Sequence, residues 1–158
     1  MKICLRYLGD PGDQQGIGQE LGVSQATVSR TVDRVVNSTA AQSNESIKFP
    51  TTNHELMEAK RISQSMYKFP TAIGVIDCTH IGILKPNRHG DEYINRKGKP
   101  TLNVQATCDA REMFTSVDVS WPASVHDSSI WRNSQTRSQL INKANVVLLQ
   151  VQQIIISF

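Results

Sequence analysis

Apolar residues recur at helical spacing in the first part of the chain and at strand-like spacing in the second. Residues 14–36 and 53–67 have the 3.6-residue period of amphipathic helices, and Pro70 predicts the end of the second helix. That helix is expected to bury Leu56, Ala59, Ile62 or Ser63, and Met66. Between the two helices, residues 37–52 are rich in Ser, Asn and Thr, which predicts a linker.

Three β-branched segments follow and are typical of strands. They are residues 71–84, 101–110 and 113–121. The last two are separated by Asp109–Glu112, a predicted hairpin turn. The third strand is expected to bury Phe114, Val117 and Val119.

The rest of the chain predicts one helix and one further strand. Residues 126–144 are expected to form the helix, with Asp127 or Ser128 as its N-cap. Residues 146–158 predict the final strand. This order predicts an α+β or mixed α/β fold whose sheet starts with an antiparallel meander. The predicted domains are 1–36, 37–70 (linker and helix) and 71–158.

Composition and charge narrow the picture only slightly. A net charge of +3 over 158 residues is compatible with a polyanionic partner. Three widely spaced cysteines favour a reducing compartment over a disulfide framework. The apolar C-terminal run of residues 146–158 is too short to span a bilayer, so no membrane association is expected.

Residues 14–36 carry the pattern of a helix-turn-helix. Gly18 is the small residue that lets a second helix cross closely, Gly22 suits the turn, and Ser24 suits the N-cap of the second helix. The inner apolar residues are Ile17, Leu21, Val23, Val28, Val32 and Val35 or Val36. An ordinary helical hairpin has a similar pattern, and it stays open as the alternative.

Several polar residues of the second helix fall outside this apolar stripe, and their types bind phosphates or base edges of double-stranded DNA. They are Gln25, Thr27, Ser29, Arg30 and Arg34. Glu20 and Asp33 reduce the positive charge nearby. Residues 85–100 form a second basic segment, in which Arg96 and Lys97 suit a nucleic-acid strand and a solvated loop equally well.

Two acids are candidate metal ligands. Asp77 lies inside an apolar strand, where an ionised carboxylate needs a cation or donors to compensate it. Asp127 lies at a strand-to-helix junction, where an N-cap role is the alternative. Cys78, His80, Cys108 and His126 lack the paired spacing of a zinc site.

The strings IDCTHI, YINRKG, NVQATCD and VHDSS together resemble the harbinger (PIF/Harbinger) family of transposase-derived nucleases, over about Leu5 to Asn142. The resemblance implies a nuclear DNA endonuclease with a helix-turn-helix and an RNase H-like core of DDE type. It also implies a divalent cation, Mg²⁺ or Mn²⁺, held by Asp77 and Asp127 as catalytic acids.

The sequence also departs from the family pattern. Gln150-Val151 stand where the family has Gly-Asp, Ala123 stands where it often has Gly, and a later catalytic Glu is not met. The resemblance therefore predicts a chain truncated at both ends, with a partial helix-turn-helix and a catalytically incomplete N-terminal half of the nuclease core. Its apolar surface is expected to favour a partner protein or self-association. Three interpretations stay open: a nuclease, a catalytically dead DNA-binding module, or the product of a decayed element.

Overall fold

The computed structural model describes residues 2–10, 13–141, 143 and 146–150. The chain divides into two compact units, a helical unit at Met1–Ser46 and a sheet unit at Ile47–Phe158. Among the described residues, no helix is long and apolar enough to cross a membrane.

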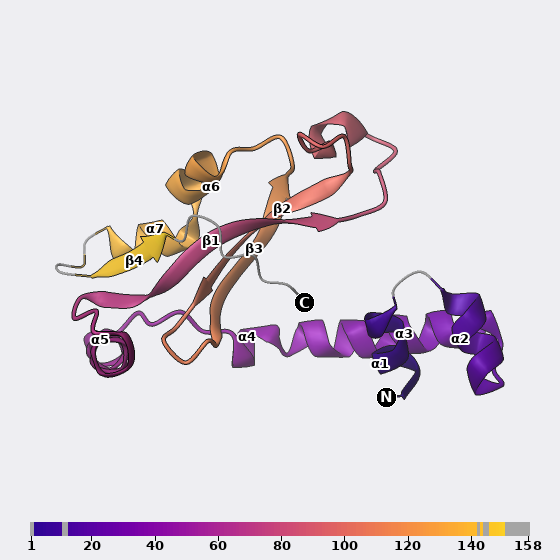
Figure 1. Cartoon of the computed structure of the whole chain (residues 1–158), viewed down its shortest axis with the longest axis horizontal. Coiled ribbons are helices and arrows are strands. Elements are labelled where there is room, and N and C mark those ends of the chain that lie inside the picture. The colour runs from indigo at the N-terminus through magenta and orange to yellow at the C-terminus, as the bar shows by residue number, and fades with distance from the viewer. Residues whose placement is uncertain (1, 11–12, 142, 144–145, 151–158) are drawn as a thin grey trace. The chain divides into compact units, whose positions relative to one another are not determined.

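The helical unit contains α1 (Lys2–Gly9), α2 (Gln14–Leu21), α3 (Gln25–Ala41) and α4 (Ser43–Ser46) (Figure 1). Residues 37–41 are thus helical, so the predicted linker over 37–52 is wrong in its first part. Ala40 and Ala41 favour helix, and no Gly or Pro interrupts the stretch before Pro50. The extended segment begins at residue 47.

The turn between α2 and α3 follows from its small and capping residues. A side chain at Gly18 would lie 2.7 Å from the backbone oxygen of Val23, so only glycine lets the chain pass there. Gly22 adopts a left-handed conformation with φ +67°. Ser24 caps α3 by accepting a hydrogen bond from the Thr27 amide. That these helices form a DNA-binding helix-turn-helix stays a prediction.

The sheet unit begins with α5 (Asn53–Tyr67), which contacts β1. A capping box between Thr52 and Glu55 fixes its first turn. Leu56 and Ser63 are buried as predicted, whereas Met66 is exposed. Lys68 ends the helix in a left-handed conformation just before the predicted stop at Pro70.

Four strands form one mixed sheet in the order β3-β2-β1-β4 (Figure 1). The strands are β1 (Ala72–Gly82), β2 (Thr101–Cys108), β3 (Phe114–Pro122) and β4 (Val147–Gln150). The predicted antiparallel meander is confirmed, since β1 pairs with β2 and β2 with β3 in antiparallel register. β4 pairs with β1 in parallel. The remainder of the predicted last strand, 151–158, lies outside the described residues.

The predicted helix over 126–144 is instead two short helices, α6 (Asp127–Asn133) and α7 (Gln135–Leu140). Ser134 takes an extended conformation and caps α7, which breaks the helix there. The N-cap of α6 is His126, and it makes no side-chain cap hydrogen bond. The prediction that Asp127 or Ser128 is the N-cap is therefore wrong, and the Asp127 carboxylate has another partner.

The sheet buries several polar side chains of β2 and exposes several apolar side chains of β3. On β2, alternate positions are buried although they are polar, namely Thr101, Asn103, Gln105 and Thr107. On β3, the residues predicted to be buried are exposed: Phe114 by 44%, Val117 by 41% and Val119 by 56%. The apolar pattern correctly predicted a strand here, but no described element covers these side chains fully.

Candidate functional site

Asp77 and Asp127 line the same hollow, which has a volume of about 200 Å³. Asp77 comes from β1, where its backbone pairs with Ala106 of β2. Asp127 is the first residue of α6, and α6 contacts β2. The remaining lining residues are Ile76, Cys78, Gln105, Ser128, Trp131 and Leu148. The fold thus brings the two predicted acids together from separate elements.

The Cys78 thiol lies beside both carboxylates. Burial raises its pKa to about 11, and the negative charges of Asp127 and Asp77 add to the rise. The amide of Gln105 donates to the Cys78 sulfur at 3.8 Å, which partly opposes the shift. At neutral pH this thiol is therefore protonated and uncharged.

Asn103 on β2 holds the Asp127 side chain. Its amide nitrogen donates to Asp127 Oδ1 at 2.9 Å and to the carbonyl oxygen of Val125 at 3.0 Å. Asn103 is 2% exposed. Asn103 and Gln105 were not predicted as site residues, although polar residues at every second position of β2 indicate that one face of this strand is polar.

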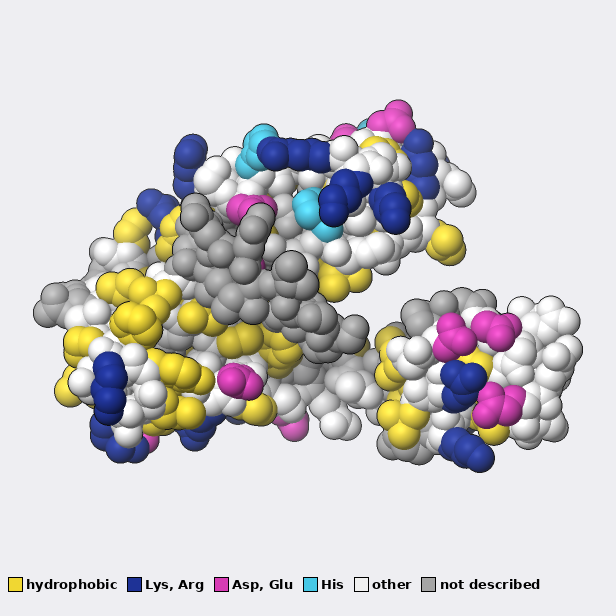
Figure 2. All heavy atoms as spheres, in the orientation of Figure 1, with side chains coloured by type: hydrophobic (Ala, Val, Ile, Leu, Met, Phe, Trp, Pro, Cys, Tyr) yellow, Lys and Arg dark blue, Asp and Glu magenta, His cyan; other side chains and the backbone are white. Residues whose placement is uncertain are grey.

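The basic segment of residues 85–100 reaches the start of α6, beside the hollow that Asp127 lines. Arg96 is within hydrogen-bonding distance of Nδ1 of His126, at 3.3 Å, so it lies next to the start of α6. The side chain of Asn95 accepts hydrogen bonds from the amides of Lys97 and Lys99, which shapes the turn that presents these cations. Arg96 and Lys97 are both exposed. Figure 2 shows Lys and Arg side chains gathered on this part of the molecule, with His side chains among them.

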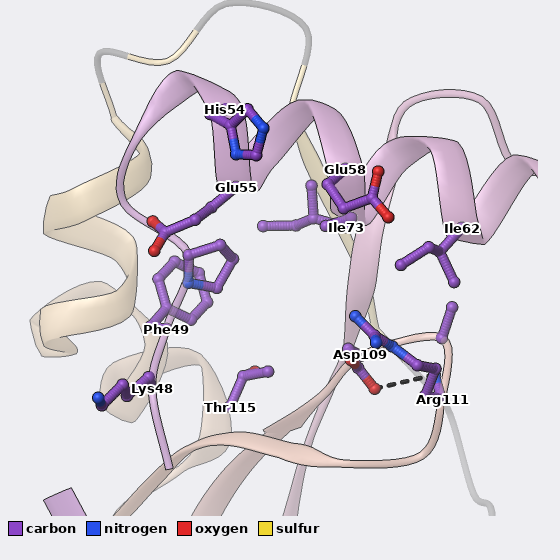
Figure 3. A pocket seen from close by; sticks show the side chains of 13 residues that line it. Lys48, Phe49, His54, Glu55, Glu58, Ile62, Ile73, Asp109, Arg111 and Thr115 are labelled. Carbon is purple, nitrogen blue, oxygen red and sulfur yellow. Dashed lines mark hydrogen bonds and ion pairs between the residues drawn. The ribbon is translucent and has the colours of Figure 1, made fainter. Parts of the chain in front are cut away.

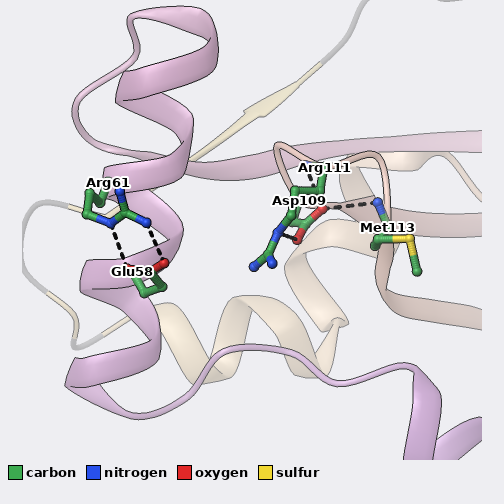
Figure 4. Close-up of polar contacts among 5 residues, drawn as sticks. All are labelled: Glu58, Arg61, Asp109, Arg111 and Met113. Atoms are coloured by element: carbon green, nitrogen blue, oxygen red, sulfur yellow. Dashed lines mark hydrogen bonds and ion pairs between the residues drawn. The ribbon is translucent and has the colours of Figure 1, made fainter.

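A larger hollow of about 310 Å³ lies between α5, the segment before it and the β2–β3 turn (Figure 3). Its acids are engaged by their own neighbours (Figure 4). Glu58 accepts two hydrogen bonds of 2.8 Å from Arg61, Glu55 belongs to the capping box of α5, and Asp109 accepts from the backbone of its hairpin turn. These carboxylates stabilise local structure, so this hollow is not the candidate site.

The candidate DNA-binding residues of the helical unit lie on α3. Gln25, Thr27, Arg30 and Arg34 are exposed, and Ser29 is half-buried. Val28 and Val32 on the other side of α3 are buried against Ile17. Arg30 is oriented by a hydrogen bond from its Nε to the carbonyl oxygen of Ala26, at 3.1 Å. The surface has the residue types that bind DNA, and its role stays a prediction.

The sheet unit thus gathers two carboxylates, one from a central strand and one from a helix. The family described as DDE superfamily endonuclease matches residues 76–155, and the chain belongs to that family. The predicted resemblance to harbinger-derived nucleases is thereby confirmed.

Relatives agree with this assignment. A rat protein named "Putative nuclease HARBI1" is 33% identical over 126 residues, covering 80% of this chain and 36% of the rat protein. The human protein of that name is 32% identical over the same shares. An Arabidopsis protein named ALP1-like is 28% identical over 134 residues, covering 84% of this chain and 32% of its own length. The chain thus spans about a third of these relatives. No solved structure matches it.

Proposed function

We propose that the sheet unit forms part of a divalent-metal-dependent endonuclease site that acts on double-stranded DNA, with Asp77 and Asp127 as metal ligands and catalytic acids. The supporting observation is that β1 and α6 deliver these two carboxylates to one hollow. The order β3-β2-β1-β4, with β4 parallel to β1, is compatible with part of an RNase H-like core.

The residues present fit a hard divalent cation. Mg²⁺ binds oxygen ligands and commonly uses one or two carboxylates, with water and substrate phosphates completing the octahedron. When bound, such a cation lowers the pKa of water and stabilises the leaving oxygen. Asp77 and Asp127 would hold it, and Arg96 and Lys97 would bind the phosphates of the DNA strand.

We also propose that this chain is catalytically incomplete when isolated. Within the described residues, no three His, Cys, Asp or Glu side chains form a metal-binding group. Two-metal hydrolysis relies on acids that bridge and flank both ions, and two carboxylates are few for that task. The 158-residue chain should therefore bind Mg²⁺ or Mn²⁺ weakly and cleave DNA poorly.

Metal titration tests the site. Mn²⁺ binding to the 158-residue chain, followed by electron paramagnetic resonance, should weaken at least ~10-fold in Asp77→Asn and in Asp127→Asn. Asp91→Asn is the matched control, since it removes an exposed acid that pairs with Lys85 instead. Equal binding by all four proteins would rule out the metal site. Nicking of supercoiled DNA with Mn²⁺ that is abolished by Asp77→Asn would show that these 158 residues suffice for cleavage, and it would overturn the proposed inactivity.

The second candidate function is DNA binding by the helical unit, favoured by the exposed polar surface of α3. Arg30→Ala should weaken duplex binding and reduce the salt slope by about one counterion. Arg6→Ala is the matched control, because Arg6 is paired with Glu20 at 3.0 Å and is less available to phosphate. An unchanged slope in Arg30→Ala would exclude this surface.

Location and association follow as further proposals. A DNA substrate implies a nuclear location, which imaging of a fluorescently tagged chain would test. The exposed Phe114, Val117 and Val119 on β3 favour self-association or a protein partner. Sedimentation of the purified chain at several concentrations would distinguish a monomer from a self-associating species.

A further inference from the structure

The side-chain amide of Asn103 is buried on the polar face of β2. Its neighbours at alternate positions, Gln105 and Thr107, are also buried. A buried amide is stable only where its polar atoms find partners. The partners of Asn103 are therefore informative about why a polar residue occupies this position.

Both partners of this amide flank the start of α6. The nitrogen Nδ2 carries two hydrogens, and it donates to the Val125 carbonyl oxygen and to Asp127 Oδ1. The oxygen Oδ1 of Asn103 is buried without a hydrogen-bond partner among the described residues. An unpaired buried oxygen costs free energy, and no partner in the described part of the chain holds this one. The two bonds that the nitrogen donates therefore set the orientation of the amide.

Asp127 gains a buried hydrogen-bond donor through this contact, in addition to the neighbouring Cys78 thiol. Asp127 is exposed, and its helix α6 has seven residues and no side-chain cap. An exposed carboxylate ordinarily samples several rotamers. The bond to a fixed, buried donor on β2 selects one of them, and the bond to Val125 fixes the backbone just before it.

We propose that Asn103 is a positioning residue that orients the Asp127 carboxylate into the hollow it shares with Asp77. The role of this contact in metal binding rests on the proposed function. Asn103 does not itself line the hollow, so it acts through Asp127. Partners of this kind tune the affinity of a site by fixing the geometry of its ligands.

The metal-dependent test is a double-mutant cycle on the whole chain with Mn²⁺ as the probe. Asn103→Leu keeps the branched shape and removes both donors, and it should weaken Mn²⁺ binding ~10–100-fold. In an Asp127→Asn background the same change should have an effect below about 2-fold. A comparable loss in both backgrounds would mean that Asn103 acts through the fold, and it would overturn the proposal.

Thr107→Val is the matched control for stability. Thr107 is equally buried on the same face of β2, but it bonds to Thr115 and not to Asp127. Its substitution should lower the melting temperature about as much as Asn103→Leu and leave Mn²⁺ affinity unchanged. A similar loss of affinity in both variants would also overturn the proposal.

A metal-free measurement separates this inference from the proposed function. In side-chain amide NMR spectra, the Asn103 protons should exchange slowly with solvent, and Asp127→Ala should accelerate one of them. Should the native chain bind no Mn²⁺ while the amide responds in this way, the metal site fails and the positioning contact stands. Rapid exchange in the native chain, or no response to Asp127→Ala, would overturn the contact whatever the metal does.

Discussion

Among the described residues, the helical unit buries apolar side chains, whereas the sheet unit buries a row of polar side chains in addition to apolar ones. In the helical unit, Ile17, Val28 and Val32 close an apolar core, and the polar residues of α3 face solvent. In the sheet unit, β2 buries a row of polar side chains, while Val117 and Val119 of β3 are exposed. One unit follows the usual rule that apolar residues are inside, and the other departs from it at the candidate site.

The buried polar residues of β2 contribute less to stability than apolar residues would, so they need another explanation. Burying Asn103 or Gln105 stabilises the fold less than burying a Leu would, because each amide loses its hydration on folding. Such residues are retained where they hold something else in place. The polar face of β2 holds Cys78 and Asp127, whereas no comparable polar group is buried in the described part of the helical unit.

The largest expected effect is the loss of stability when the apolar core of the helical unit is disrupted. Ile17→Ala removes a fully buried side chain and should destabilise the helical unit by about 2–5 kcal/mol. Both tryptophans, Trp121 and Trp131, lie in the sheet unit. Urea unfolding followed by circular dichroism should therefore show an earlier helical transition, and the tryptophan fluorescence transition should stay in place. Leu5→Ala, an exposed change in α1, is the control.

The second prediction concerns the buried chemistry of the sheet unit. A Cys78 thiol with a pKa near 11 should react with iodoacetamide at pH 8 roughly 100-fold more slowly than an ordinary thiol. Asp127→Asn removes one nearby negative charge, so it should lower the thiol pKa and speed the reaction. Mass spectrometry of the Cys78 peptide measures the rate. Reaction at the rate of a free thiol would show that the hollow is open and weakly charged.

The third prediction tests a polar contact on β3. Asp118 accepts a hydrogen bond from the indole of Trp121 at 2.8 Å. Burial alone would raise the Asp118 pKa, but hydrogen bonds from Ser120 and Trp121 outweigh it and lower the pKa. This contact therefore stabilises the fold above the unfolded pKa, and the stabilisation is lost as pH falls through the lower, folded pKa.

Asp118→Asn should accordingly cost about 1 kcal/mol at pH 7, a value reduced for the partial exposure of the carboxylate. Urea unfolding of both proteins at pH 7 and at pH 2 measures the difference. The two curves should converge at pH 2. A gap that persists there would assign the effect to packing and not to the charge.

The smallest expected effect is on an exposed residue of β3, and a large effect there would contradict the contrast between the two units. Val119→Thr replaces an exposed valine on β3 with a residue of similar shape and β-propensity. It should change the free energy of unfolding by less than about 0.5 kcal/mol. A loss of several times that amount in the purified chain would mean that a second copy of the chain covers this face.

The sequence predicts the helical unit better than the candidate site. Gly22 and Ser24 act locally, and their conformations follow from a few neighbouring residues. The positions of β1 and β2 were predicted because β-branched residues fill these strands and turn residues follow them. The partners of Asn103 could not be predicted in this way, since Val125 and Asp127 are more than twenty residues away.

The sequence also could not predict which face of β3 is covered by another element. The alternation of Val117 and Val119 with polar neighbours correctly indicates a strand, but alternation cannot say whether another element covers that face. The break at Ser134 was not predicted, because a serine can lie inside a helix or act as an N-cap. In the structure Ser134 is extended and accepts a hydrogen bond from the Arg137 amide, so it caps α7.

The arrangement of β1 between β2 and β4 also has a consequence in time. One edge of β1 is paired soon after synthesis, because β2 follows it across a single loop. The other edge waits for β4, and 64 residues separate Gly82 from Val147. At ribosomal speeds this delay is roughly 3–13 s. During that interval one edge of the strand that carries Asp77 has no β4 to pair with, and an unpaired edge favours pairing with another chain.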